Sequence, residues 1–193
     1  MQHLRISFVL GFAAACSSSN VSSTADAQRA YVGLDGAIGK AIQLGFDGFN
    51  AASSANIPTE TGSGDASGTI TVTGQVDQGA SSNKTMRLAV ALAGYSDGDV
   101  TVDNTSTNIT YDTGSAAPAL DLDLMNIPTG TLSGSLAGTY TMSGDLTGTV
   151  ALDLQIDGTL QAGSGSAVER GSGTTITGTA VSDSGTYDVD VTL

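Results

Sequence analysis

The sequence contains few of the side chains on which most protein chemistry depends. Among its 193 residues there is no tryptophan, one histidine (His3), one cysteine (Cys16) and three prolines. Lysine and arginine together number six, against 19 aspartates and glutamates, so the formal net charge is −13. Nucleic acid is therefore an unsuitable partner, because phosphate binding requires clustered lysine and arginine. The same acidity argues against a basic face that lies flat on anionic lipid.

The first sixteen residues have the order of charge and hydropathy found in export signals. His3 and Arg5 precede a short apolar run, residues 6–15, which ends in three alanines and is followed directly by Cys16. A basic start, a short apolar centre and small residues at the cleavage site are typical of a secretory signal peptide. The apolar run is too short for a transmembrane helix, which needs about 20 residues.

The residues Ala13-Ala14-Ala15-Cys16 resemble the lipobox of bacterial lipoproteins, although Ala13 stands where leucine is the commoner residue. The resemblance implies that residues 1–15 are removed and that Cys16 carries a thioether-linked diacylglycerol, through which the protein is held on a membrane. Such anchoring is durable when several acyl chains are present, because each buried CH₂ contributes about 0.8 kcal/mol. By the same resemblance, Ser17 implies sorting to the outer membrane of the cell envelope. A free thiol or an intermolecular disulfide is the alternative for a lone cysteine.

We expect the chain to comprise a signal peptide (1–15), a lipidated flexible tether (16–26) and a single domain (27–193). Small polar residues predict the tether. A helix is expected at about 27–54, with Asp26 as a candidate N-cap. The glycines in this segment each cost about 1 kcal/mol, so the helix needs a surface to pack on. Its apolar stripe consists of Leu34, Ile38, Ile42, Phe46 and Phe49. Residues 59–67 are interpreted as a loop.

From about residue 68 to 193 the apolar residues recur with a period of two, which predicts half-buried antiparallel strands. Between Leu132 and Ala162 every even-numbered residue is apolar or glycine, so the connections inside this stretch must preserve the two faces. Ser143-Gly144-Asp145 is a candidate three-residue turn. A weak ten-residue echo in the same stretch fits hairpin strands better than a solenoid.

Glycines on the apolar face indicate a strongly curved sheet, because they allow bending and close approach of backbones. The predicted fold class is therefore mainly β. We expect an antiparallel curved sheet or barrel-like meander of about eight to ten strands, with one N-terminal helix packed on it.

Little in the sequence points to catalysis. Once residues 1–15 are removed, no histidine remains, which excludes Ser-His-Asp and Cys-His sites and zinc sites built on histidine or cysteine. Residues 81–84 match the S-x-x-K pattern of penicillin-binding proteins, but they lie between two predicted strands and no companion motif follows, so we interpret them as a turn. We expect no cofactor and no enzymatic activity.

Carboxylates supply the remaining candidates. Asp97, Asp99 and Asp103 are a weak candidate set of oxygen ligands for Ca²⁺, although the glycine between the first two does not match an EF-hand loop and Asp-Gly is a common turn. The alternating pairs Asp121/Asp123 and Asp188/Asp190 are interpreted as solvated strand faces.

These observations favour a lipid-anchored, non-catalytic protein of the cell envelope with a structural or surface-interaction role, whose partner is an envelope or surface protein. The alternative is a carrier or sensor of an apolar ligand, held in a coiled sheet that the N-terminal helix covers. The two hypotheses differ in the interior of the domain, since a carrier needs an apolar cavity of about 300 Å³ or more.

Overall fold

The computed structural model describes residues 20–51, 54–77, 79–164 and 168–193. Cys16 and the predicted signal peptide lie outside the described residues, and the side chain of Phe49 is not described either. The predicted fold class is confirmed, with eleven strands in the described part of the chain. The elements in chain order are α1 (Thr24–Ala51), β1 (Glu60–Ser63), β2 (Ser67–Val76), β3 (Lys84–Ser96), β4 (Asp99–Val102), β5 (Thr105–Asp112), β6 (Ala119–Met125), β7 (Thr131–Gly144), β8 (Gly148–Ala162), β9 (Val168–Arg170), β10 (Thr175–Ser182) and β11 (Gly185–Thr192).

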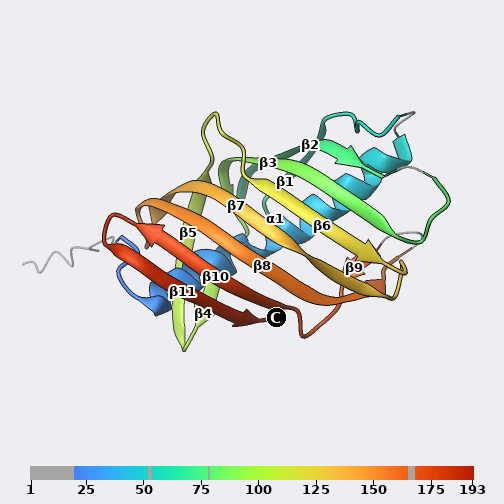
Figure 1. Cartoon of the computed structure of the whole chain (residues 1–193). Helices are drawn as coiled ribbons and strands as arrows, with labels where there is room; N and C mark the ends of the chain where they lie inside the picture. Colours follow the sequence, from blue (N-terminus) through green and yellow to red (C-terminus); the bar gives the residue numbers. More distant parts are fainter. Residues whose placement is uncertain (1–19, 52–53, 78, 165–167) are drawn as a thin grey trace, which may run out of the picture.

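The strands form one strongly curved antiparallel sheet (Figure 1). Its main path runs β1-β2-β3-β5-β7-β8-β10-β11, so that β1 and β11 are the two edges. Two short strands, β5 and β6, lie between the long strands β3 and β7. Strand β6 pairs with β3 and β7 along one half of their length, and β5 pairs with them along the other half. Two strands were not predicted: β1, which lies in the expected loop 59–67, and the three-residue β9, which pairs with the end of β8.

Helix α1 lies across the concave face of this sheet and contacts both edge strands, β1 and β11, as well as β2 to β5 and β9 (Figure 1). The predicted apolar stripe is buried at each of its described side chains, and it belongs to the same hydrophobic core as the inner face of the sheet. The strands alternate as expected; β6, for example, buries Leu120, Leu122 and Leu124 and exposes the residues between them. The helix therefore occupies the concave side of the curved sheet and completes its hydrophobic core.

The helix begins at Thr24, three residues earlier than predicted, and Ser23 is its N-cap in place of Asp26. The backbone N–H of Asp26 donates to Ser23 Oγ at 3.1 Å, and the Asp26 carboxylate accepts from the backbone N–H of Ser22 at 3.1 Å. This reciprocal arrangement resembles a capping box. Because Val21 is fully buried, the last part of the predicted tether belongs to the folded domain.

The longest hairpin, β7–β8, explains why the alternation from Leu132 to Ala162 never changes parity. The strands pair from Thr131 opposite Thr159 to Met142 opposite Gly148, and the connection between them contains three residues, Asp145–Thr147. An odd connection keeps even-numbered residues on the inner face of both strands. The predicted turn at Ser143-Gly144-Asp145 is thus two residues too early, while the hairpin interpretation of the repeat is confirmed.

Glycines on the inner face stand opposite large apolar residues. Gly74 pairs with Leu88, and Gly178 pairs with Leu154. Both have positive φ, +135° and +148°, which L side chains rarely adopt, and a Cβ at either position would lie 2.2 Å from a carbonyl oxygen of the neighbouring strand. These two glycines let β2 and β10 bend around the helix.

Candidate functional site

An open cleft of about 350 Å³ lies beside the middle of α1, where the helix faces β9. It is lined by Gly39, Lys40, Ile42, Gln43, Val168, Glu169 and Arg170. The lining brings together two of the chain's few cationic side chains, Lys40 and Arg170. Because cations are scarce in this protein, the partners of these two residues determine what the cleft can bind.

Arg170 is held by Asp35 of α1, which lies 135 residues earlier in the sequence. Both guanidinium nitrogens Nη1 and Nη2 donate to the two carboxylate oxygens of Asp35, and Tyr31 Oη donates to Asp35 Oδ1 at 2.9 Å. These hydrogen bonds raise the pKa of Arg170 although its burial acts in the opposite direction. Burial, with the Asp35 charge, raises the pKa of Tyr31. Arg170 therefore stays a cation and Tyr31 a neutral phenol at neutral pH.

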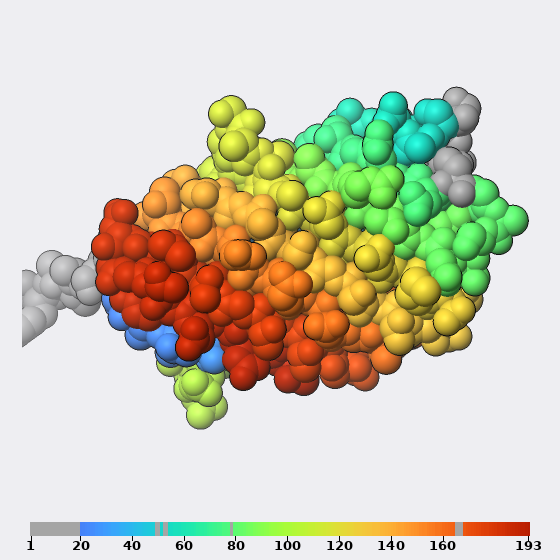
Figure 2. Space-filling model, viewed as in Figure 1, coloured from blue at the N-terminus to red at the C-terminus, as the bar shows by residue number. Residues whose placement is uncertain are grey.

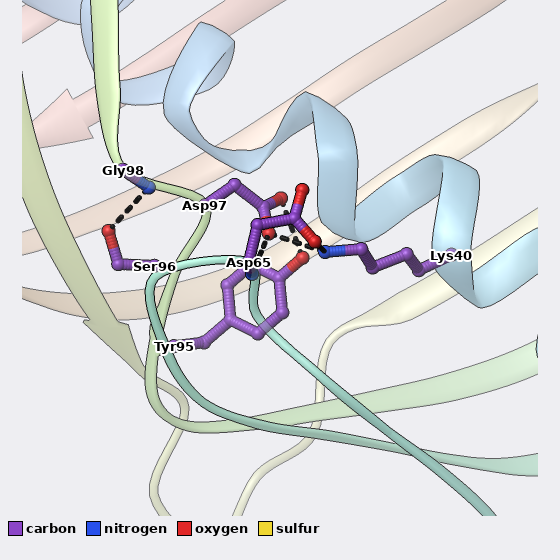
Figure 3. Close-up of polar contacts among 6 residues, drawn as sticks. All are labelled: Lys40, Asp65, Tyr95, Ser96, Asp97 and Gly98. Carbon is purple, nitrogen blue, oxygen red and sulfur yellow. Dashed lines mark hydrogen bonds and ion pairs between the residues drawn. The ribbon is translucent and has the colours of Figure 1, made fainter.

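Lys40 is the centre of a second cluster of polar side chains (Figure 3). Its Nζ donates to Asp97 Oδ1 at 2.5 Å and to Asp65 Oδ1 at 2.8 Å, and lies 5.4 Å from the centroid of the Tyr95 ring. Tyr95 Oη donates to Asp97 Oδ2 at 2.7 Å, and the backbone N–H of Asp65 donates to Asp97 Oδ1 at 2.9 Å. The cluster thus ties the helix to the β1–β2 and β3–β4 connections.

The pKa values of Asp97 and Lys40 in this second cluster are shifted in the directions that favour their charged forms. Burial acts to raise the pKa of Asp97, but the hydrogen bonds from Lys40, Tyr95 and the Asp65 N–H outweigh it and hold that pKa below its ordinary value. Burial acts to lower the pKa of Lys40, and the two carboxylates more than reverse this. Lys40 is therefore held as an ammonium ion, which has no lone pair with which to attack a carbonyl.

Asp97, Asp99 and Asp103, the candidate calcium ligands, lie in different local environments. Asp97 belongs to the Lys40 cluster, and Asp99 accepts from Asn108 Nδ2 at 2.7 Å. Asp103 lies in the tight β4–β5 turn, where it and Asn104 have positive φ. In the described part of the chain no group of three or more histidine, cysteine, aspartate or glutamate side chains is placed to hold a metal ion.

The S-x-x-K segment forms a turn, as interpreted from the sequence. Ser81 Oγ accepts from the backbone N–H of Asn83 at 3.0 Å, and Lys84 Nζ donates to the carbonyl of Gly79 at 2.7 Å. The carboxylates of β6 and β11, at Asp121, Asp123, Asp188 and Asp190, are exposed on the outer face of the sheet.

The interior between helix and sheet is packed. A cavity of about 10 Å³ lies there, lined by Leu34, Ala37, Ile38, Val90, Leu92, Leu120, Leu136 and Tyr140. That volume is no more than a single water molecule needs. Among the residues that the structure describes, no buried side-chain polar atom lacks a hydrogen-bond partner.

No family model, curated protein or solved structure matches this chain. In the described segments no helix is both long and apolar enough to cross a membrane. Lys40, Arg170, Asp35 and Asp65 were not singled out from the sequence, and Asp97 was named only as a candidate calcium ligand, because each cluster joins residues that lie far apart in the chain. The scarcity of lysine and arginine was the one signal that pointed toward them.

Proposed function

We propose that this protein is a lipid-anchored, non-catalytic component of the bacterial cell envelope, whose folded domain has a structural or surface-interaction role. The lipobox-like sequence at Cys16 supports the anchor. The observation that carries the rest is the packing of α1 into the concave face of the sheet, where the cavity that both line has a volume of about 10 Å³. A domain filled in this way presents its outer surface, and not an interior, to its partners.

The cleft beside α1 is the preferred site for such an interaction. Its cations and carboxylates already neutralise one another, so binding there does not require an isolated charge to be desolvated at full cost. Ile42 and Val168 are the branched apolar side chains of the lining, and both are largely buried. A lining of this composition suits a protein segment with both apolar and charged side chains.

The anchor is tested by Cys16→Ser in the full-length chain expressed in a Gram-negative bacterium. We expect the wild-type protein in the outer-membrane fraction with the mass of a diacylglyceryl modification, and the variant without that modification and released from membranes. An unmodified wild-type protein would contradict the proposal.

The carrier alternative is tested on the domain expressed without residues 1–16 and purified without detergent. Native mass spectrometry should give the bare mass, unchanged after incubation with a bacterial lipid extract. A lipid bound at one-to-one stoichiometry would favour the carrier function, and it would require α1 to leave the sheet.

A further inference from the structure

We propose that the domain stands end-on upon the membrane, with the end that holds the start of α1 facing the lipid surface. We call this the anchor end and define it by residues 20–23, the β7–β8 connection 145–147 and the β10–β11 turn 183–184. The opposite end, the distal end, carries the segment 79–83 and the β6–β7 connection 126–130. The inference rests on the proposed lipidation of Cys16.

The chain enters the folded domain at a fixed point of the anchor end. Val21 is fully buried, and its carbonyl accepts a hydrogen bond from Ser182 Oγ at 2.6 Å. The side chain of Asn20 lies against Gly148 at the start of β8. The start of α1 lies beside the β10–β11 turn, at one end of the elongated molecule (Figures 1 and 2).

The distance between this point and the lipid is limited by the covalent chain. Five residue steps separate Cys16 from Val21, and they span at most about 18 Å when fully extended. Strand β8, which runs along the body of the domain, has 15 residues and is roughly 46 Å long. The distal end therefore stays away from the bilayer when the long axis of the domain is perpendicular to the membrane. The distal end contacts the bilayer only when the whole domain lies on its side.

The charge on the outer face of the sheet opposes that second arrangement when this face is the side turned to the membrane. The outer face of the sheet exposes carboxylates along most of its length, at Asp121, Asp123, Asp153, Asp157, Asp188 and Asp190. The anchor end exposes Asp145 and Asp183 among serine and asparagine side chains. An end-on domain places fewer carboxylates near anionic headgroups, where each like charge is repelled within a Debye length. The end contacts headgroups without inserting apolar side chains.

End-on orientation determines where the cleft beside α1 opens. Lys40 follows the helix start, Thr24, by sixteen residues, which corresponds to about 24 Å along the helix axis. The cleft therefore opens sideways, above the headgroups, where a partner on the same membrane has access to it.

The test uses the full-length lipidated protein in vesicles of phosphatidylethanolamine and phosphatidylglycerol. Because Cys16 is the only cysteine and its sulfur is consumed by the lipid, one introduced cysteine can be labelled uniquely. Asp183→Cys reports on the anchor end, and Thr129→Cys is the matched exposed position at the distal end. We expect a headgroup nitroxide to quench a fluorophore at residue 183 at least about twofold more than at residue 129, since roughly 40 Å of strand separates the two ends.

Equal quenching at the two positions of vesicle-bound protein would overturn the orientation alone. Failure of the protein to bind vesicles would overturn the lipid anchor, and the orientation with it. As a control, about 20 glycine and serine residues inserted after Ser19 lengthen the tether to a flexible coil of roughly 27 Å. The difference in quenching should then shrink; an unchanged difference would contradict the limit set by the short tether.

Discussion

The glycines of α1 give a pair of substitutions whose effects should differ in sign. Gly33 and Gly39 lie in the same helix, and each replacement by alanine gains the same helix propensity, about 1 kcal/mol. A Cβ at Gly39 has no neighbouring atom within 4 Å, whereas a Cβ at Gly33 would lie 2.3 Å from Tyr111 Oη. We expect Gly39→Ala to stabilise the protein and Gly33→Ala to destabilise it.

The magnitude at Gly33 follows from the position of Tyr111. This side chain is fully buried, and its hydroxyl donates to the carbonyl of Ala30 at 2.8 Å. Moving the ring to admit a methyl group breaks that buried hydrogen bond, at about 1–3 kcal/mol, and strains the packing by about 1–3 kcal/mol. After subtraction of the propensity gain, Gly33→Ala should cost about 1–5 kcal/mol, while Gly39→Ala gains about 0.5–1 kcal/mol.

Urea unfolding followed by circular dichroism measures both effects as changes in the free energy of unfolding. Tyr111→Phe removes the atom nearest to the added methyl group. The double variant Gly33→Ala/Tyr111→Phe should therefore lose less free energy of unfolding than the sum of the losses in the two single variants. If Gly33→Ala stabilised the domain as much as Gly39→Ala, the helix would not lie against Tyr111 and the packing argument would be refuted.

Three further perturbations test the core, the start of the helix and the Lys40 cluster. Leu34→Ala should lower the free energy of unfolding by about 2–5 kcal/mol, and the enlarged cavity should take up benzene, which a rise in the melting temperature would reveal. Burial acts to raise the pKa of Asp26, but hydrogen bonds from Ser22 and Ser23 outweigh it and lower the pKa from the ordinary 3.8. Its stabilisation is thus complete above that pH and is lost as the pH falls below it, so Asp26→Asn should weaken the acid dependence of the melting temperature. Lys40→Met should raise the pKa of Asp97 in an NMR titration and cost about 1 kcal/mol, because the ion pair is partly exposed.

The regular part of this fold is predictable because local residue patterns determine it. Alternation placed the strands from Gly68 onward on the correct faces, and the unbroken parity from Leu132 to Ala162 required an odd connection before its position was known. The helical stripe was predicted for the same reason, since its spacing of three and four residues is independent of tertiary contacts.

The parts that were not predicted depend on contacts between distant residues. Ser22 and Ser23 resemble tether by composition, and only the burial of Val21 against the far end of the chain makes them a helix cap. Strand β1 shows no alternation of apolar and polar residues, and only its pairing with β2 makes it a strand. The Lys40 cluster joins residues 40, 65 and 97, so no sequence window contains it. By helix propensity alone the glycines weaken α1, whereas in the structure Gly33 allows the helix to approach Tyr111 of β5 and Gly36 allows it to approach Asp97 of the β3–β4 connection.

The position of α1 inside the sheet has a consequence for the order in which the protein acquires its structure. The helix is synthesised before every strand that covers it, and its partners include a residue of the last strand, β11: Gln28 Nε2 donates to the carbonyl of Asp190. Contacts between residues so far apart in the chain require a large loss of loop-closure entropy before they can stabilise the fold, and this slows folding. The side of α1 that packs on β11 therefore stays uncovered until β11 has been synthesised. A nascent chain that lacks the β10–β11 hairpin cannot complete the packing around the helix, so the topology delays the final folding step until that hairpin is present.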